Sequence, residues 1–412
     1  MQENSVAQNS SYLSAREAAA MLGVRPQTLY AYVSRGLIRS EATEGRARRY
    51  HAEDVAALRR RRQRDPAQAA QAALSFGAPV LDSAITLILD DRLYYRGQDA
   101  CLLARRASLR AVAALLWQAD ETAIFAPDNL PKPGPGFALA RRALAGLAPI
   151  ERCLALLPIA AAADTRALDL APSAVAASGA RILRLLAAAV AEAEPSPRPV
   201  DAVLAEAWGL GAQRRPLLRA ALILCADHEL NVSAFAARCV ASVLASPYNA
   251  VIAGIAALQG ARHGGASERT DAFLGEALAA ADPEALAAAY LRRGDRLPGF
   301  GHPLYRGADP RARLLLDLMQ EQQAPLAADG ERVAAAVTAL IGRPPNIDFA
   351  LALLRRSLAL PAGGALALFV LGRSLGWLAH AQEQYAADRL IRPRARYVGP
   401  PVGESGRGAS SA

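Results

Sequence analysis

The sequence predicts an all-α protein of two or three domains, and three observations support this. The chain has 412 residues, which is more than one domain usually holds. Alanine and leucine dominate its apolar residues, aromatic residues make up only 5%, and β-branched residues are sparse, so helices are favoured over sheets. From residue 79 almost to the end, apolar helical patterns are separated by prolines and glycines, with no alternating strand series and no repeat period.

The sequence of residues 12–64 predicts a small module of three helices and a hairpin. Ser14 and Glu17 have the spacing of a capping box that opens the helix AREAAAML. Pro26 suits the first turn of a second helix, PQTLYAYVSR. The stretches LIRS and RARRY predict two short strands around the turn EATEG, and a third helix is expected to begin near Ala52. Helix, tight turn, helix and basic hairpin together indicate a winged helix-turn-helix domain.

This module resembles the DNA-binding domain of MerR-type regulators and phage excisionases, through YLSAREAAAMLGVRPQTLYAYVSRGLIRS and RRYHAEDVAAL. Residues 1–65 hold 12 arginines and 7 acidic residues, a net charge of +5 that favours a polyanionic partner. In such motifs the second helix enters the major groove and the wing touches the backbone. The contacts implied are from Arg25, Gln27, Thr28, Tyr30 and Arg35 in the helix region and from Arg46, Arg48 and Arg49 in the wing. A module that no longer binds DNA and serves as an interaction domain is the alternative.

The rest of the composition indicates a cytoplasmic protein. Four cysteines are scattered without a CxxC pair, which predicts neither a zinc site nor a disulfide framework. The N-terminus, MQENSVAQNSS, is polar and does not resemble a signal peptide. An uncharged run at 239–261 is long enough to cross a bilayer, but its Ser246-Pro247 pair and Gln259 favour buried helices. We therefore expect no metal site and no membrane segment.

The stretch ALQGARHGGASERTDAF (257–273) places His263 before two glycines and an expected helix. An imidazole at a helix N-terminus tends to stay neutral, because the helix dipole disfavours its cation. A neutral imidazole can donate a hydrogen bond to a carbonyl that is becoming an enolate. A histidine that only caps a glycine-rich turn is the alternative.

The stretch GFGHPLYRGADPRARLL (299–315) holds His302 in a loop shaped by glycine and proline. Asp309 is predicted to cap a helix whose first residue is Pro310. Arg311 then lies in the first helical turn, where the macrodipole disfavours a cation. The sequence thus places an arginine where its own helix does not stabilise it.

Two further stretches carry polar residues in apolar surroundings. In LCADHELNVSAF (224–235), His228 and its neighbours predict either a buried polar network or a ligand-facing cluster. In GRPPNIDFALALL (342–354), Asn346 is expected to cap a helix with Asp348 in its first turn, as ordinary helix-start chemistry or as a general base. The segment GRSLG matches a nucleophile elbow, but it lies in a helical run without a preceding strand, so we exclude that function.

Six motifs in order carry a resemblance to a known family. They are DHELNVSAFAARCVAS, GARHGGA, GFGHPLY with DPRA, NIDF, GRSLGW and IRPRARYVGP. Together they closely resemble the citrate synthase family. Nearer the N-terminus, the segment VLDSAITLILDDRLYYRGQDACLLARRASLRAVAALLW resembles the N-terminal segment of that family, so the resemblance covers residues 76–400.

The resemblance implies an enzyme that condenses acetyl-CoA with oxaloacetate and water to citrate and CoA, with the thioester as substrate and no cofactor. By position, His263 matches the residue that stabilises the enol, Asp348 matches the base, and His302 matches the donor to the oxaloacetate carbonyl. The matching oxaloacetate-binding residues are His228, Arg311, Arg373, Phe369 and Arg392, the last reaching across a dimer. An anionic substrate would then complete the surroundings of Arg311.

The resemblance also implies a mainly helical homodimer with a large and a small domain, whose closure over the cleft between them excludes water. The expected order is a disordered start (1–11), a winged helix-turn-helix domain (12–64), a linker (65–78), the large domain (79–264), the small domain (265–360), the return of the large domain (361–400) and a disordered tail (401–412).

Three departures from the family pattern leave the substrate open. GHPLY stands where many synthases have GHRVY, Ser267 replaces an asparagine in HGGAS, and NIDFALALL lacks the Tyr-Ser-Gly that often follows the catalytic aspartate. Relatives such as 2-methylcitrate synthase and citryl-CoA lyase share much of the pattern. An alternative of another class is a DNA-binding regulator that uses a citrate synthase-like domain as a metabolite sensor, and a bifunctional protein is also open.

Overall fold

A computed structural model gives the structure of residues 12–22, 24, 29, 32–33, 37–42, 48–63, 81–260 and 263–399. The chain divides into two compact units, Met1–Asp82 and Ser83–Ala412. The start, linker and tail predicted from the sequence lie outside the described residues.

In the N-terminal unit, two helices pack on a small antiparallel sheet of strand order β1-β3-β2. The elements are β1 (Tyr12–Ser14), α1 (Ala15–Leu22), β2 (Ser40–Ala42), β3 (Arg48–His51) and α3 (Ala52–Gln63). The Ser14 backbone N–H donates to the Glu17 carboxylate (2.8 Å) and the Glu17 N–H donates to the Ser14 hydroxyl (3.3 Å), which confirms the capping box. Leu29, Tyr32 and Val33, the described residues of the expected second helix, are helical. The arrangement fits a winged helix-turn-helix domain.

Two details of this unit differ from the prediction. Strand β1 was not expected, and it completes the sheet by pairing Leu13 with Tyr50 of β3. The strand predicted at 37–40 begins only at Ser40, because the chain bends before it and Ile38 is buried in the core. That core consists of Ala18, Ala19, Leu22, Leu29, Ile38, Tyr50 and Val55.

The second unit begins with a three-stranded sheet that the sequence patterns did not predict. It consists of β4 (Thr86–Leu89), β5 (Arg92–Tyr95) and β6 (Gln98–Asp99), paired antiparallel in that order. Asp90 (φ 50°) and Asp91 (φ 57°) make the first turn, and Arg96 (φ 48°) and Gly97 (φ 80°) make the second. Two consecutive residues with positive φ give the tight hairpin turn that matches strand twist. The expectation of no strands here was therefore wrong.

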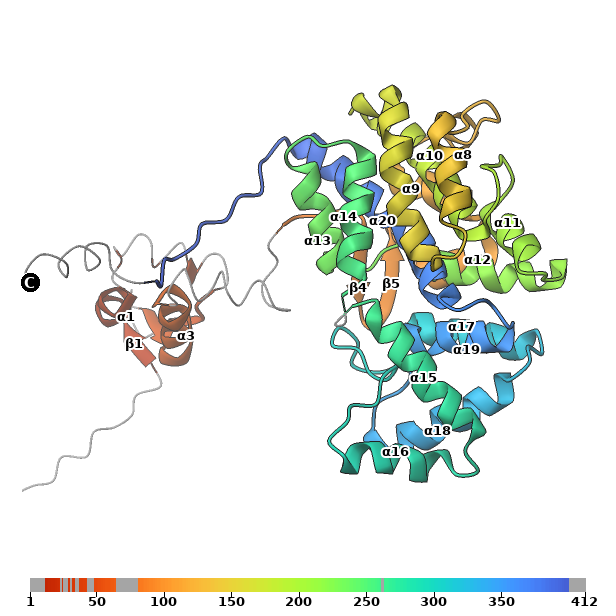
Figure 1. Ribbon diagram of the computed structural model, residues 1–412. Coiled ribbons are helices and arrows are strands. Elements are labelled where there is room, and N and C mark those ends of the chain that lie inside the picture. Colours follow the sequence, from red (N-terminus) through yellow and green to blue (C-terminus); the bar gives the residue numbers. More distant parts are fainter. Residues whose placement is uncertain are drawn as a thin grey trace, which may run out of the picture. The chain divides into compact units, whose positions relative to one another are not determined.

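Most of the second unit is helical, as predicted (Figure 1). The helices up to residue 258 are α5 (Ala100–Arg106), α6 (Leu109–Trp117), α7 (Glu121–Ile124), α8 (Pro135–Ala143), α9 (Pro149–Ala163), α10 (Pro172–Ala191), α11 (Val200–Ala207), α12 (Arg215–Leu224), α13 (Val232–Ala241) and α14 (Pro247–Leu258). Short 3-10 helices occupy Thr165–Leu168 and Ala212–Arg214.

Helix α20 (Gly364–Ala387) is the centre of this unit. It packs against α6, α9, α10, α12, α13 and α14, and all of its first eighteen residues are buried. Both α10 and α20 are long and apolar enough to cross a membrane, but most of each helix is covered by the surrounding protein. That burial is what a core helix requires, so neither helix supports a membrane span.

Five helices form a second group within this unit: α15 (Gly265–Ala279), α16 (Pro283–Arg292), α17 (Pro310–Glu321), α18 (Ala327–Ile341) and α19 (Ile347–Ser357). They contact one another through the pairs α15–α19, α16–α18 and α17–α19, and they lie together at the lower end of the unit in Figure 1. All five fall within the predicted small domain, 265–360. The division of the chain does not separate this group, so the small-domain boundary stays a prediction.

Candidate active site

The residues singled out from the sequence come from separate segments of the second unit. The segments are the loop after α12 (His228), the turn before α15 (His263), the loop between α16 and α17 (His302), the first turns of α17 (Arg311) and α19 (Asp348), and the middle of α20 (Phe369, Arg373). Ring contacts and mutual charge effects show that these seven residues share one region. Arg392 is apart from them.

His228 and His302 meet at the side chain of Tyr305. The His228 Nε2 atom lies 2.8 Å from the Tyr305 hydroxyl, and the His228 and His302 rings are 4.8 Å apart. The Leu304 backbone N–H points at His302 Nδ1 (3.2 Å), so the neutral ring carries its hydrogen on Nε2. Burial and the nearby Arg311 charge lower the pKa of His302 to about 4 and hold that of His228 well below 6.5. Both rings are therefore neutral near pH 7.

The loop of His302 is docked on the segment that leads to Asp348. The Gly301 N–H donates to the Pro344 carbonyl (2.8 Å), and the Asn346 N–H donates to the Gly299 carbonyl (2.9 Å). The Asn346 side chain adds a bond to the Gly301 carbonyl (3.0 Å). Gly299 has φ 86°, and a side chain there would also come within 2.6 Å of a methyl group on α15, so only glycine fits. Two loops far apart in sequence thus form one platform.

His263 lies in the turn before α15, as expected. Its Nε2 atom is 3.1 Å from the Ser233 hydroxyl, and its ring meets the Phe369 ring edge-on at 6.1 Å. Burial, followed by the Arg373 charge, lowers the pKa of His263 to about 4. The neutral imidazole was expected from the helix dipole, whereas burial has the larger effect in the structure. Ser233 was not singled out from the sequence.

Asp348 is the second residue of α19, and Asn346 caps that helix as predicted by accepting the Asp348 N–H (3.0 Å). The Ser267 hydroxyl donates to Asp348 Oδ1 at 2.6 Å. Burial raises the pKa of Asp348, while the Ser267 hydrogen bond and the Arg311 charge oppose that rise. From the sequence, Ser267 was only a departure from the family pattern. In the structure it is the polar partner of the candidate base.

Arg311 lies in the first turn of a helix that Asp309 caps, as the sequence predicted, and it also has a carboxylate partner that the sequence did not indicate. Asp309 caps α17, and its carboxylate also accepts from Arg311 Nε (3.0 Å) and Nη2 (2.8 Å). Both side chains are almost fully buried. Although burial disfavours the charged form, the carboxylate raises the pKa of Arg311. Asp309 therefore offsets the unfavourable dipole, and Arg311 is buried rather than exposed on the surface.

Among the described residues, no carboxylate forms a hydrogen bond or ion pair with Arg373. It is 1% exposed, its Nε donates to the Cys225 carbonyl (2.7 Å), and its guanidinium lies 4.7 Å from the Phe369 ring centre. Its Nη1 atom is buried and has no hydrogen-bond partner in the part of the chain that the structure describes. Burial lowers the pKa of Arg373, with Asp227 opposing. A buried cation with an unused donor is a suitable partner for an anionic ligand.

Arg392 and the predicted DNA contacts lie elsewhere. Arg392 is exposed in the extended segment after α20, and no hydrogen bond or ion pair joins it to the described residues. Arg48 and Arg49 are exposed on β3 of the N-terminal unit. The other predicted DNA contacts lie outside the described residues: Arg25, Gln27, Thr28, Tyr30, Arg35 and Arg46.

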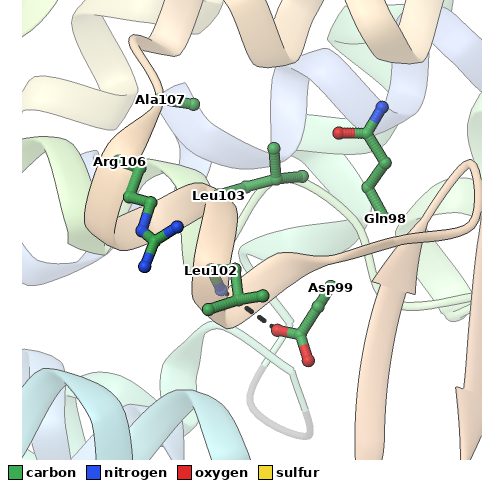
Figure 2. A pocket seen from close by; sticks show the side chains of 6 residues that line it. All are labelled: Gln98, Asp99, Leu102, Leu103, Arg106 and Ala107. Atoms are coloured by element: carbon green, nitrogen blue, oxygen red, sulfur yellow. Dashed lines mark hydrogen bonds between the residues drawn. The ribbon is translucent and has the colours of Figure 1, made fainter.

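A cavity of about 380 Å³ lies along α5 (Figure 2). Its lining consists of Gln98, Asp99, Leu102, Leu103, Arg106 and Ala107. Asp99 accepts the Leu102 N–H (3.0 Å) as the cap of α5, so its carboxylate has a structural role. None of the predicted catalytic residues lines this cavity. Among the described residues, no three His, Cys, Asp or Glu side chains are grouped to hold a metal ion.

Comparisons with known proteins agree with this arrangement. The chain matches the family model of the citrate synthase C-terminal domain over residues 74–394 and that of a helix-turn-helix domain over residues 12–63. Citrate synthase 2 of Bacillus subtilis is 31% identical over 362 residues, which cover 79% of this chain and 95% of that protein. The 2-methylcitrate synthase of Shewanella oneidensis is 36% identical over 183 residues, 43% of this chain and 49% of that protein.

Solved structures share the fold. The citrate synthase from Thermotoga maritima has a TM-score of 0.66 and 26% identity, covering 79% of this chain and 94% of that one. A second solved structure is the citrate synthase of Thermoplasma acidophilum in a ternary complex with carboxymethyl coenzyme A and oxaloacetate. It has a TM-score of 0.65 and 25% identity, covering 79% of this chain and 95% of that one.

Proposed function

The chain belongs to the citrate synthase family through residues 74–394, and from this premise we propose that it condenses acetyl-CoA with oxaloacetate and water to citrate and CoA. The observation that carries the proposal is that one region holds three histidines with depressed pKa values together with the buried Asp348, whose pKa is raised. A thioester α-proton is weakly acidic, so its removal needs a base and a donor to the developing enolate together.

We assign the enolisation step to Asp348 and His263. The Asp348 carboxylate removes a methyl proton of acetyl-CoA, and burial makes it a stronger base than an exposed aspartate. Because the Ser233 hydroxyl donates to Asn231 Oδ1 (2.8 Å), it accepts from His263, and the neutral His263 ring carries its hydrogen on Nε2. We assign this N–H as the donor to the thioester oxygen, which replaces the Ser233 hydroxyl as its acceptor when substrate binds, and a neutral donor suits an enolate that forms without full proton transfer.

In the next step the enol carbon attacks the carbonyl carbon of oxaloacetate. We assign His302 as the hydrogen-bond donor to the carbonyl oxygen in this step. Because His302 Nδ1 accepts the Leu304 N–H, its Nε2–H is free to donate to the carbonyl oxygen as that oxygen becomes negative. Water then hydrolyses the citryl thioester and releases CoA.

The oxaloacetate dianion is assigned to Arg373, Arg311 and His228, beside Phe369. The Asp309 carboxylate already neutralises part of the Arg311 charge, whereas Arg373 has a buried, unpaired Nη1. We therefore assign Arg373 the larger share of the electrostatic binding.

A homodimer that supplies Arg392 across its interface is part of the same proposal. Large apolar side chains are exposed both around α13 and in the extended segment that carries Arg392. They are Val232, Val243 and Leu244, and Leu390, Tyr397 and Val398. Apolar surfaces of this kind are typical of contacts between subunits. A cytoplasmic location also belongs to the proposal.

Measuring CoA release from acetyl-CoA and from propionyl-CoA, each with oxaloacetate, tests the proposal and determines which acyl group the protein prefers. Relatives include both citrate and 2-methylcitrate synthases, so the preferred thioester decides between these activities. Asp348→Asn should lower kcat by about a hundred- to ten-thousandfold. Asp128→Asn is the control, since Asp128 is exposed and outside the cluster. A protein that binds oxaloacetate but turns over neither thioester would be a metabolite sensor instead.

The helix-turn-helix match favours a second function, DNA binding by the N-terminal domain. Among the described residues, we assign phosphate contact to Arg48 and Arg49, which are exposed on β3. Fluorescence anisotropy with duplex DNA at increasing salt measures the slope of log affinity against log salt concentration. The magnitude of this slope should decrease by about one for each arginine replaced by alanine. No binding at low salt would leave an interaction domain as the remaining role.

A further inference from the structure

The turn of the β4–β5 hairpin reaches the loop that carries His302. The Asp91 carboxylate accepts the Arg306 N–H through Oδ1 (2.7 Å) and the Gly307 N–H through Oδ2 (2.9 Å). A side chain on Gly307 would begin 3.2 Å from Asp91 Oδ2, so the approach is close. The residues joined are more than two hundred positions apart in sequence, which excludes a local turn or cap as the reason for these bonds.

The segment held by Asp91 fixes the contacts of two candidate oxaloacetate histidines. Tyr305 directly precedes Arg306 and is 6% exposed. Its hydroxyl is the partner of His228 Nε2 (2.8 Å), and its ring is 5.2 Å from the His302 ring. A shift of the 306–307 backbone would therefore move Tyr305 and change the relative positions of the His228 and His302 rings.

The same hairpin also holds the loop of His228 at its other end. The Thr86 hydroxyl donates to Asp227 Oδ2 (2.6 Å). The Tyr95 hydroxyl contacts the carbonyls of Ile223 (3.0 Å) and Asp227 (3.2 Å). Asp227 is adjacent to His228 in sequence and is fully buried. One two-stranded element is thus bonded to both histidine-bearing loops.

We propose that the β4–β5 hairpin is a positioning element for the oxaloacetate-binding histidines and that Asp91 is its positioning residue for the His302 loop. This inference rests on the proposed function. A carboxylate that accepts two backbone N–H groups makes charge-assisted bonds, which are shorter and stronger than neutral ones. Catalytic groups must keep their geometry closely, and a displacement of about 1 Å lowers rates by up to about a hundredfold.

The test compares Asp91→Ala with Asp90→Ala. Both residues have positive φ in the same turn, but the exposed Asp90 side chain has no hydrogen bond or ion pair with the described residues. The two variants therefore share the backbone change and differ in the two bonds to the His302 loop. Asp91→Ala should lower kcat about tenfold and raise the KM for oxaloacetate, with little change in the KM for acetyl-CoA. Asp90→Ala should stay within about twofold of the parent.

Amide hydrogen exchange gives a readout that does not depend on turnover. The amides of Arg306 and Gly307 should exchange faster in Asp91→Ala and at the parental rate in Asp90→Ala, in otherwise folded proteins. Asp91→Asn, which keeps the shape and loses the charge, should show the same changes to a smaller degree and replaces Asp91→Ala if that variant does not fold.

A folded Asp91 variant with the kcat of Asp90→Ala would overturn the proposal. If the parent protein shows no turnover with either thioester, the proposed function fails. The affinity for oxaloacetate is then the quantity compared between the two variants, in place of kcat. In that case, equal affinity or equal amide exchange in the two variants overturns the positioning role by itself.

Discussion

Ser267 is the residue that most directly adjusts the candidate base. Ser267 is 2% exposed, and its hydroxyl donates to Asp348 Oδ1. Ser267→Ala removes a bond that stabilises the carboxylate, so the already raised pKa of Asp348 should rise further. Because the base must be ionised, the acidic limb of the pH profile of kcat should move to higher pH.

Thr270→Val is the matched control for this prediction. Thr270 is buried on the same helix, but its hydroxyl donates to the Ala266 carbonyl and not to Asp348. Its pH profile should remain at the parental position, whereas the Ser267→Ala profile moves. Superimposable profiles for the two variants would contradict the role given to Ser267.

The depressed pKa values of His263 and His302 predict a loss of stability in acid. Each has a pKa of about 4 in the fold against 6.5 unfolded, so its contribution is complete above pH 6.5 and is lost as the pH falls toward 4. The free energy of unfolding should decrease by about 1 kcal/mol per pH unit for each histidine in that window. Urea unfolding between pH 7 and pH 4 measures this slope.

His263→Gln and His302→Gln should each reduce the slope relative to the parent. The carboxylates titrate in parent and variant alike, so the difference between the two slopes isolates the imidazole. Identical slopes would mean that the histidines are not desolvated in the fold as the structure indicates.

At the scale of elements, the glycines of α20 decide how closely this helix approaches the His228 loop. A Cβ at Gly376 would lie 2.3 Å from Asp227 Oδ1 and 2.5 Å from the Ala226 carbonyl oxygen, while the Gly376 N–H donates to that carbonyl (3.0 Å). The GRSLG segment is therefore a packing motif of a helix, in agreement with its exclusion as a nucleophile elbow.

Gly376→Ala should displace the loop that carries His228. Overpacking of this kind costs about 2 kcal/mol of stability, and kcat should fall as well because His228 moves. Gly136→Ala on α8 is the control, since a Cβ there meets no atom within 4 Å. Denaturation midpoints and kcat for both variants check this, and a tolerated Gly376→Ala would contradict the close contact.

The elements also show which local signals in the sequence are informative. Helix starts are predicted from caps, and Asn346 and Asp309 cap α19 and α17 as expected. The β4–β6 sheet escapes prediction because its strands are short and the chain is otherwise rich in helix formers. The pair Asp90-Asp91, between apolar and aromatic runs, is the available signal for a hairpin.

At the scale of the whole molecule, the assembly determines whether Arg392 reaches an active site. Arg392→Ala and Asp348→Asn should each inactivate a homodimer. If Arg392 acts across the interface, a mixed dimer of the two variants contains one site with both residues intact. Co-expression in equal amounts should then restore about a quarter of the parental activity, because half of the dimers are mixed and each has one working site.

Activity that stays absent in the mixed dimer would place Arg392 and Asp348 in the same subunit. A monomer by light scattering at working concentration would exclude the shared site altogether. The parental protein mixed with Asp348→Asn is the control for exchange of subunits.

The sequence by itself determined the helical class, the winged helix-turn-helix domain, the family and the helix caps. These depend on composition and on contacts within a few residues of the chain, which a sequence displays directly. It also singled out the histidines and Asp348 through ordered motifs, although their catalytic roles remain proposals.

Only the tertiary structure decided the partners of those residues. Ser267 bonds Asp348, Tyr305 bonds His228, and Asp91 holds the His302 loop. Each pair joins segments far apart in sequence, and such pairings depend on how helices pack and loops dock. Burial of the whole cluster, which shifts the pKa values, likewise arises only when the chain has folded, because desolvation is a property of the surroundings and not of the residue type.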